Sequence, residues 1–534
     1  MNFIEERILE KNDLGNLKLR FPPEPNGLIH LGHAKSICLN FGLAEKYNRP
    51  CNLRFDDTNP TTENTSYVEA IKEDIKWLGY KWDDVKFTSD YFEFIYNCSI
   101  KLIEKGLAYV DHSTSEEIAA TKGDLITPGI NSIYRDRTIE DNLLHLESMK
   151  NGLYDEGSCT LRLKIDMANH NMILRDPVIY RIIKTEHHHV GNKWCIYPMY
   201  DFAHPISDYI ENISDSLCTL EFEVHRPLYN WILSNLDFEG IIPEEMEFAR
   251  LNVTNNILSK RKLKLLVENN HVNGWDDPRL LTISGLRRRG YTPDSIKNFC
   301  ETIGYTKRES IIDIKLLEEC LRADLNKKAL RYMCVFEPIK LTITNWENDT
   351  ELCTIENNPE DENEGNREVI FTKELYIESE DFREEANNKY HRLKLGGEVR
   401  LKGAYIIKAN EVIKDAYGNI IEILCTYDPE TKSGGSSEKK VKGTIHWVSY
   451  VHNKELIVKD YDNLFNIESP DKEDNIIEHL NVESVTIKYA VAELAIENCK
   501  ENAVQFMRKG YYILDKGSKN IFNKTVSLKD GFKI

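Results

Sequence analysis

Two stretches near the N-terminus alternate apolar and polar side chains, and each is followed by a helical pattern. The alternation covers residues 17–21 and 51–55, as in short strands. Apolar residues then recur at helical spacing, first at Ala34, Ile37, Phe41 and Ala44, and later at Val68, Ile71, Ile75 and Leu78. This order of strand, helix, strand and helix predicts a Rossmann-like, doubly wound α/β fold.

The pattern changes character four times after this beginning. An interruption with a predicted hairpin around residues 162–180 indicates an insertion, after which the sheet pattern returns. Helical patterns follow, and strand patterns with Gly and Asn turns then dominate, at 339–344, 399–407, 420–427 and 443–450. The chain is therefore predicted to be multidomain, α/β plus all-β. Its expected segments are 1–90 and 199–258 for the two halves of the α/β domain, 91–198 for the insertion, 259–330 for a helical part and 331–534 for the all-β part.

The composition fits a soluble globular protein of several domains. The chain has 534 residues, of which 41% are hydrophobic and 29% charged. No apolar run approaches a membrane span and no N-terminal signal segment is visible, so we expect a cytoplasmic protein without a membrane partner. The twelve cysteines are scattered without a C-x-x-C pair, which fits the reducing cytosol and argues against a zinc ribbon.

The net charge of −19 does not by itself suggest a nucleic-acid partner, because phosphate contacts need local positive charge. Charge is unevenly distributed, however. Residues 259–264 and 287–289 are basic clusters, whereas residues 347–364 carry acids and no base and are typical of a solvated loop. A basic face for RNA is therefore compatible with the acidic total.

The candidate chemistry begins in residues 20–35, which read R-F-P-P-E-P-N-G-L-I-H-L-G-H-A-K. The prolines predict a rigid turn from strand to helix, with His30 and His33 on one face of the first helical turn. Gly32 between them lets a flat ligand approach the backbone, and the helix N-terminus favours phosphate. Two surface histidines on an amphipathic helix are the alternative interpretation of these residues alone.

Other candidate binding residues add less to the functional prediction. Asp56 follows the second strand, where carboxylates lie at the ligand crevice of doubly wound sheets. No G-x-G-x-x-G motif is present, so a nicotinamide or flavin cofactor is not expected. His187, His188 and His189 are adjacent and cannot all converge on one ion, and no cysteine or carboxylate partner is suggested nearby. We therefore expect no metal site in the protein.

The histidine turn matches the HIGH motif of class I aminoacyl-tRNA synthetases. P-P-E-P-N-G and H-A-K-S-I resemble the glutamine-charging branch in particular, and the resemblance continues over nearly the whole chain. Residues 258–262, L-S-K-R-K, are similar to the second class I motif, KMSKS, with Leu258 in place of methionine. Alone, these lysines would be an ordinary surface run. The family implies that the insertion binds the tRNA acceptor end, that a helical connector follows, and that two C-terminal β-barrels read the anticodon.

The resemblance implies a glutamine–tRNA ligase reaction in two steps. Glutamine attacks the α-phosphate of ATP and releases pyrophosphate, and the 2′-hydroxyl of the terminal tRNA adenosine then takes the acyl group. Such a reaction needs positioning and charge neutralisation more than a protein nucleophile. The cofactors implied are ATP and Mg²⁺, and the partners are tRNA(Gln), ATP and L-glutamine, with a monomer expected.

The resemblance also assigns residues to roles. His30, His33 and Lys260 are the expected catalytic residues. The expected ATP-binding residues are Glu24, Pro25, Asn26, His30, Gly32, His33, Arg250, Leu251, Leu258, Ser259 and Lys260. The expected amino-acid-binding residues are Arg20, Asp56, Tyr200, His204 and Cys218, with Glu24 nearby. The expected tRNA-binding residues are Leu125, Arg331, Arg392, Arg400 and Gln505. Leu125 resembles the leucine that wedges apart the terminal acceptor base pair, although an ordinary loop leucine is an equal alternative.

Three positions depart from the family pattern. Val224 replaces an expected aspartate that reads the acceptor stem, Glu245 replaces a glutamine that supports the amino-acid pocket, and Asp215 replaces a histidine. Cys218 matches, whereas glutamate enzymes tend to have arginine there. A glutamate-charging or non-discriminating relative and a non-catalytic tRNA-binding relic therefore stay open as alternatives.

Overall fold

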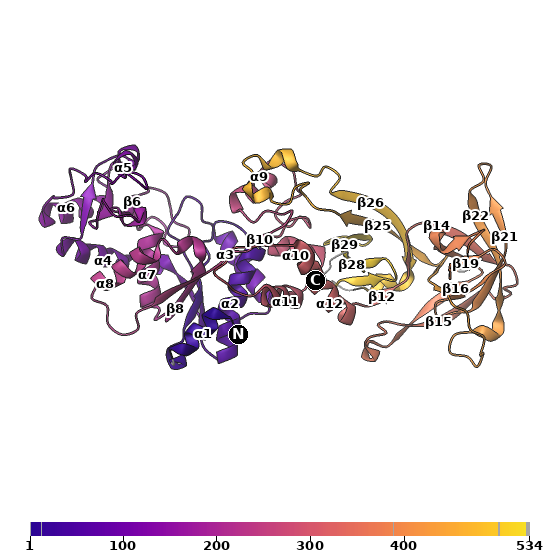
Figure 1. Ribbon diagram of the computed structural model, residues 1–534. Coiled ribbons are helices and arrows are strands. Elements are labelled where there is room, and N and C mark those ends of the chain that lie inside the picture. Colours follow the sequence, from indigo (N-terminus) through magenta and orange to yellow (C-terminus); the bar gives the residue numbers. More distant parts are fainter. Residues whose placement is uncertain (1, 12, 388, 500–501, 530–534) are drawn as a thin grey trace. The chain divides into compact units, whose positions relative to one another are not determined.

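The computed structural model describes residues 2–11, 13–387, 389–499 and 502–529. The chain forms two compact units, one of residues 1–252 and 300–312 and the other of residues 253–299 and 313–534 (Figure 1). Among the described residues, no helix combines the length and the apolar character needed to cross a membrane.

The first unit begins with the predicted α/β order. A helix, α1 (Phe3–Glu10), precedes β1 (Leu19–Phe21), β2 (Cys51–Phe55) and β3 (Val85–Phe87), which form a parallel sheet in that order. The crossovers are α2 (Leu31–Tyr47) and α3 (Thr65–Trp77). The strand and helix predictions for residues 17–79 are confirmed, because both helices occupy the segments with apolar residues at helical spacing.

A second parallel pair, β8 (Asp215–Thr219) and β9 (Glu244–Phe248), lies beside this sheet. Ser214 N donates to Lys18 O at 3.1 Å, and Arg20 Nη1 donates to Leu217 O at 3.1 Å, so β8 neighbours β1. In the chain, α7 (Tyr200–Ile210) precedes β8 and α8 (Arg226–Asn235) follows it. Residues from both ends of the unit therefore meet at the strands β1 and β8.

The residues between these two parts form an antiparallel sheet. Its order is β4 (Ala108–Asp111), β5 (Thr160–Leu163), β6 (Val178–Ile182) and β7 (Ile196–Pro198). It packs with α4 (Phe92–Glu104) and α6 (Ile139–Lys150) around a core that includes Leu102, Leu146 and Leu161. Helix α5 (Ser115–Thr121) leads into an exposed loop. The predicted hairpin around residues 162–180 is confirmed as the pairing of β5 with β6.

The second unit contains helices and then strands. Its helices are α9 (Lys260–Glu268), α10 (Ile283–Arg289) and α12 (Ile314–Lys328). Three further elements lie at the points where the chain passes from one unit to the other: β10 (Asn252–Val253), α11 (Pro293–Ile303) and β11 (Ile311–Ile312). One seven-stranded sheet has the order β12 (Arg331–Tyr332), β27 (Val504–Phe506), β28 (Gly510–Leu514), β29 (Ile521–Ser527), β25 (Asn453–Tyr461), β26 (Val485–Glu493) and β13 (Cys334–Val335).

A second seven-stranded sheet has the order β23 (Thr444–Ile445), β20 (Glu398–Leu401), β21 (Ile406–Lys414), β22 (Ile420–Asp428), β14 (Pro338–Ile343), β17 (Glu374–Glu378) and β24 (Val448–Ser449). The pairs β15 (Thr350–Glu356) with β16 (Asn366–Thr372) and β18 (Phe382–Arg383) with β19 (Leu393–Lys394) complete the strands. The expected all-β character of this part is confirmed.

Two predicted strands were wrong in detail. Residues 399–407 form the ends of two antiparallel strands, β20 and β21, because Gly403 takes a φ of 67° and turns the chain. Residues 443–450 form two short strands, β23 and β24, in place of one. In both cases an apolar run continued through a turn, so periodicity alone did not reveal the break.

Candidate active site

The two histidines of the turn cap helix α2. His30 is the N-cap residue, one position before the helix, and not a residue of the first turn as predicted. Its Nδ1 accepts from Gly32 N at 3.1 Å, while His33 Nδ1 accepts from His30 N at 3.2 Å. The ring centroids are 3.9 Å apart. The sequence H-x-G-H therefore satisfies backbone donors that the first helical turn would otherwise leave unpaired.

This capping fixes the chemistry of both rings. Because Nδ1 accepts a hydrogen bond in each, the proton of each neutral imidazole is on Nε2, which makes Nε2 a donor. Two N–H donors thus accompany the positive end of the helix dipole. An anion with several oxygens, such as a phosphate, is the ligand that this combination favours.

The proline-containing turn is tied to the neighbouring loops. Asp56 N donates to Pro23 O at 3.1 Å, Asn64 N donates to Pro25 O at 3.0 Å, and Asn26 N donates to Glu24 O at 2.9 Å. These bonds hold the turn against the end of β2 and the start of α3. Glu24, Pro25 and Asn26 therefore share one site with Asp56.

A buried cluster of charges lies beneath that site. Arg20 of β1 and Arg54 of β2 are both fully buried, and both donate to Asp208 Oδ1, at 3.1 and 2.7 Å. Each also contacts His204, Arg20 at Nε2 (2.9 Å) and Arg54 at Nδ1 (3.1 Å). Burial alone would raise the pKa of Asp208, but Arg20, His204 and Arg54 hold it well below its usual range. Arg20 is thus enclosed among protein groups.

The two oxygens of the Asp56 carboxylate differ in their hydrogen bonding. Its Oδ1 accepts from Arg54 Nε at 3.0 Å and from Thr88 Oγ1 at 2.9 Å. Its Oδ2 lies 3.4 Å from His204 Nδ1 and makes no hydrogen bond of good geometry with any group in the described part of the chain. Burial opposes ionisation, yet Arg54, His204 and Arg20 lower the pKa of Asp56. The group is therefore an anion able to bind a cationic substrate atom.

Tyr200, Cys218 and Glu245 surround the same cluster. The Tyr200 ring stacks on the His204 ring with centroids 4.8 Å apart. Burial raises the pKa of the Cys218 thiol, and Glu245 raises it further. Burial also raises the pKa of Glu245, against the opposing effects of His204 and Cys218. The carboxyl at the position expected for glutamine is therefore biased toward its neutral form, which has the shape of an amide.

Sequence reasoning missed several residues of this cluster. Arg54, Asp208 and Tyr229 are buried, and Tyr229 OH donates to Asp208 Oδ2 at 3.0 Å. One signal was available, since His204 and Asp208 are four residues apart and face the same side of α7. No local pattern could have paired Asp208 with Arg54, which lies 154 residues earlier.

Two of the expected ATP-binding residues, Arg250 and Leu251, lie after β9. Lys35 of α2 is buried, and its Nζ donates to Ala249 O at 2.9 Å, which joins the helix to this segment. Leu251 is buried, whereas Arg250 is about half exposed and lies 3.8 Å from Glu221 Oε1. The structure thus links the segment 249–251 to the helix that His30 and His33 cap.

The second motif belongs to the second unit. Leu258 N donates to Asp471 Oδ2 at 3.0 Å, Ser259 is the N-cap residue of α9, and Lys260 begins the helix. Lys262 Nζ donates to Glu473 O at 2.9 Å. Helix α9 therefore starts with three consecutive cations and no acid in its first turn, an arrangement that opposes its dipole. A phosphate bound here would relieve this unfavourable charge distribution.

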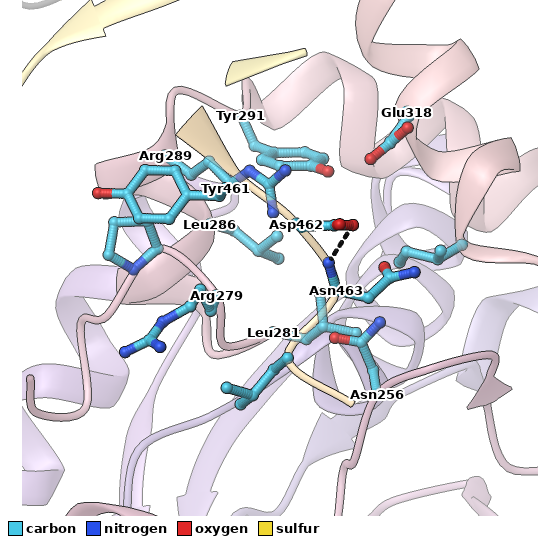
Figure 2. Close-up of a pocket in the computed structure, with 13 residues that line it drawn as sticks. Asn256, Arg279, Leu281, Leu286, Arg289, Tyr291, Glu318, Tyr461, Asp462 and Asn463 are labelled. Atoms are coloured by element: carbon cyan, nitrogen blue, oxygen red, sulfur yellow. Dashed lines mark hydrogen bonds between the residues drawn. The ribbon is translucent and has the colours of Figure 1, made fainter. Parts of the chain in front are cut away.

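A cavity in the same unit is not a nucleotide site. It has a volume of about 70 Å³ and is lined by Arg289, Tyr291, Glu318 and Tyr461 among others (Figure 2). Ordinary small-molecule pockets begin at roughly 300 Å³. Its lining includes the cations Arg279 and Arg289 and the acids Glu318 and Asp462, and the Arg289 guanidinium lies 5.8 Å from the Tyr461 ring centroid. It is therefore a polar gap between elements of the second unit.

The residues expected to contact tRNA occupy separate places. Leu125 is 81% exposed on the loop after α5. Arg331 and Gln505 are cross-strand neighbours in β12 and β27. Arg392 lies 3.1 Å from Asp381 Oδ1, and Arg400 Nη1 donates to Thr431 O at 2.8 Å. The structure therefore brings Arg331 and Gln505 together, while Arg392 and Arg400 belong to the other seven-stranded sheet and its loops.

The histidine triplet corrects one expectation. A carboxylate does lie nearby, since His188 Nε2 is 3.2 Å from Asp57 Oδ2, and Asp57, His187 and His188 form a group with metal-binding spacing. His187 Nδ1, however, accepts from His189 N at 3.1 Å, so Nε2 carries the proton that it donates to Asp57 O at 2.8 Å. Both nitrogens of His187 are thus committed to the protein, which argues against a metal ligand role.

Two of the unusual positions now have a structural context. Asp215 is buried, and its Oδ1 accepts from Lys11 Nζ at 2.5 Å while Oδ2 accepts from Ser214 Oγ at 2.6 Å. The aspartate therefore pairs with the N-terminal segment and not with the pocket. Val224 is 54% exposed, and its carbonyl accepts from Asn171 Nδ2 at 2.7 Å.

Comparisons with known proteins identify the family of this chain. The family model described as the catalytic domain of class I tRNA synthetases (E and Q) matches residues 16–327, and two anticodon-binding domain models of the same family match residues 329–428 and 444–515. The chain is 54% identical to a glutamine–tRNA ligase of Rhodopirellula baltica, over 99% of this chain and 90% of the relative. The corresponding ligases of Haemophilus influenzae and Escherichia coli are 52% and 51% identical, over 99% of this chain and 97% of each relative.

A solved glutamate–tRNA synthetase of Elizabethkingia anophelis has a TM-score of 0.44 and 18% identity over 59% of this chain and 71% of that chain, which is too weak a likeness to support an argument. The catalytic family model, by contrast, spans more than half of this chain, and the full-length relatives match it almost from end to end. The chain therefore belongs to the class I tRNA synthetases of the glutamate and glutamine (E and Q) family.

Proposed function

We propose that this protein is a glutamine–tRNA ligase, which activates L-glutamine with ATP and transfers it to the terminal adenosine of tRNA(Gln). The observation that carries the proposal is the 51–54% identity to ligases of that name over 99% of the chain. The site supports it, because Asp56 is a buried anion whose Oδ2 makes no hydrogen bond of good geometry within the described residues, and its backbone is hydrogen-bonded to the turn that precedes α2.

In the first step a carboxylate oxygen of glutamine attacks the α-phosphorus of ATP, and pyrophosphate leaves. His30 and His33 would donate from Nε2 to phosphate oxygens, and Lys260 would neutralise the leaving pyrophosphate. Mg²⁺ would arrive with ATP and supply further charge neutralisation through phosphate oxygens and water. Glu24, Pro25, Asn26, Gly32, Arg250 and Leu251 would shape the nucleotide site in the first unit, and Leu258 and Ser259 keep their predicted role in ATP binding.

Asp56 would hold the ammonium group of glutamine, and this role needs the unused Oδ2. Tyr200 and Cys218 would line the part of the site that holds the side-chain amide of glutamine. Arg20 and His204 would hold the carboxylates of Asp56 and Asp208 in place. A glutamate substrate would bring a further carboxylate close to the carboxylates of Asp56 and Asp208. Such a pocket can reject glutamate without an editing reaction.

In the second step the 2′-hydroxyl of the terminal adenosine attacks the acyl carbon, and AMP leaves. We assign residues 1–90 and 199–258 to a Rossmann-like catalytic domain, 91–198 to the acceptor-binding insertion, 259–330 to a helical connector and 331–534 to two anticodon-binding β-barrels. Leu125 would meet the acceptor end, and Arg331, Arg392, Arg400 and Gln505 the anticodon loop. A monomer in the cytoplasm stays a prediction.

Glu245 keeps a second candidate function open, because a carboxyl replaces the expected amide beside Cys218. The alternative is a ligase that charges glutamate, or both amino acids. A catalytically inactive RNA-binding relic is the third, and it has less support, since His30, His33 and Lys260 are all present.

Charging assays with labelled glutamine and labelled glutamate, run side by side on tRNA(Gln), test the proposal. We expect a glutamine product and at least about 10³-fold lower efficiency with glutamate. Equal efficiency with both amino acids would replace the proposal by the non-discriminating alternative. Tight tRNA binding without any charging would favour the relic.

A further inference from the structure

An aliphatic tip protrudes from the loop that follows α5. In this loop, residues 122–130, Leu125 is 81% exposed and Ile126 is 94% exposed. Both side chains therefore meet water on almost all sides, at a cost that burial against a partner would remove. Because both side chains lie on a short loop, the backbone conformation of that loop sets the direction in which they point.

The loop closes on itself at its tip. Asp124 Oδ1 accepts from Ile126 N at 2.8 Å and from Thr127 N at 2.7 Å, and Asp124 N donates to Thr127 O at 3.1 Å. Gly123 has a φ of 73°, and a Cβ at this position would lie 2.4 Å from Thr127 O. These contacts predict one preferred loop shape.

Arg175 holds that shape from inside. It is 2% exposed, and its Nη1 donates to Lys122 O, Asp124 O and Thr127 O at 2.9, 2.9 and 3.1 Å. Its Nε donates to Asn169 O at 2.7 Å. All four acceptors are backbone carbonyls, three of them in the loop itself. The buried guanidinium thus joins the two ends of the Leu125 turn to the body of the insertion.

We propose that Arg175 is a positioning residue, which fixes the loop of residues 122–130 so that Leu125 can separate the first base pair of the tRNA acceptor stem. This inference rests on the proposed function. Arg175 is buried and does not itself reach RNA, so its effect must pass through the loop. Loss of the clamp lets the loop adopt several shapes, and the wedge then meets the base pair in few of them.

The test compares two tRNA(Gln) transcripts, one with an intact first acceptor pair and one with a mismatch there. Arg175→Met should lower kcat/KM on the paired tRNA by at least about 10-fold, because several charge-assisted hydrogen bonds are lost. On the mismatched tRNA, which needs no wedge, its kcat/KM should stay within about threefold of the wild type. Arg175→Lys keeps the charge without the planar fork of donors, so its kcat/KM on the paired tRNA should lie between those of the wild type and Arg175→Met.

Leu125→Ala provides the reference, since it should show the same dependence on the base pair while leaving the clamp intact. Arg137→Met is the matched control, because Arg137 Nη1 donates to Val110 O elsewhere in the insertion and should show no difference between the two transcripts. Equal loss on both transcripts for Arg175→Met and Arg175→Lys would overturn the inference. Absence of glutamine charging by the wild type would instead overturn the proposed function.

Discussion

His33 Nδ1 accepts the backbone N–H of His30 at 3.2 Å, so one histidine of the turn closes the cap that the other begins. The cap uses only Nδ1, and the proposed catalytic role uses only Nε2. The two roles can therefore be separated by substitution.

The first prediction follows from this separation. Asparagine places its Oδ1 near the position of Nδ1 and has no group at the position of Nε2. His30→Asn and His33→Asn should each keep the melting temperature within about 2 °C and lower ATP–pyrophosphate exchange, measured with tRNA present, by about 10²–10³-fold. Exchange within threefold of the wild type would remove that histidine from the mechanism.

The second prediction concerns Asp56. Asp56→Asn keeps an oxygen for Arg54 and Thr88 but removes the negative charge opposite the substrate ammonium. The KM for glutamine should rise about 10–100-fold, the worth of a charge-assisted hydrogen bond, while the KM for ATP stays constant. The control is Asp57→Asn, because Asp57 Oδ1 accepts from Ser89 N and serves the fold. Parallel increases in both KM values would contradict the assignment.

The third prediction concerns Glu245. Because burial raises its pKa, the neutral form persists to higher pH than in an exposed glutamate and acts as an amide of the same shape. Ionisation at higher pH would place a further anion in the pocket. Glu245→Gln should therefore exceed the wild type in kcat/KM for glutamine, and increasingly so as the pH is raised from about 6 to about 9. Identical pH profiles of kcat/KM would show that Glu245 does not titrate in this range.

The fourth prediction concerns stability and Glu63. Burial, together with Asp57, raises the pKa of Glu63 from 4.5 to about 9. The folded protein thus keeps a proton that the unfolded chain releases above pH 4.5, so stability is lost as pH rises toward 9. The loss is at most about 1.4 kcal/mol per pH unit.

Glu63→Gln removes this titration and should flatten the curve of unfolding free energy against pH. Denaturation in urea at about pH 6 and about pH 8.5 measures the difference. Glu69→Gln, on the exposed face of α3, is the matched control and should follow the wild type. A wild-type curve as flat as that of Glu63→Gln would show that Glu63 titrates normally.

The fifth prediction concerns Lys260. Lys260→Ala should lower the rate of glutamine activation by about 10²–10³-fold, because it removes a charge that the transition state needs. Binding of tRNA, measured by filter retention, should stay within threefold. Lys264→Ala is the matched control, since Lys264 lies on the same helix and contacts Glu268. Normal activation by Lys260→Ala would leave the basic start of α9 without a catalytic role.

Local patterns predicted the elements around the site. The spacing of Ala34, Ile37 and Phe41 indicated α2, and the prolines before His30 indicated its start, because caps and amphipathic faces depend on residues a few positions apart. The order of strands and helices followed for the same reason. The break at Gly403 was missed, since apolar residues continued on both sides of it.

By itself the sequence determined the order of most helices and strands around the site, and which residues carry the class I motifs. The tertiary structure decided whether the polar residues of the strands are exposed or buried, and which groups they pair with. The polar positions that alternate in β1 and β2 include Arg20 and Arg54, which are fully buried and pair with Asp208 of α7. That pairing joins positions more than 150 residues apart, and a buried charge is tolerated only where folding brings its partner.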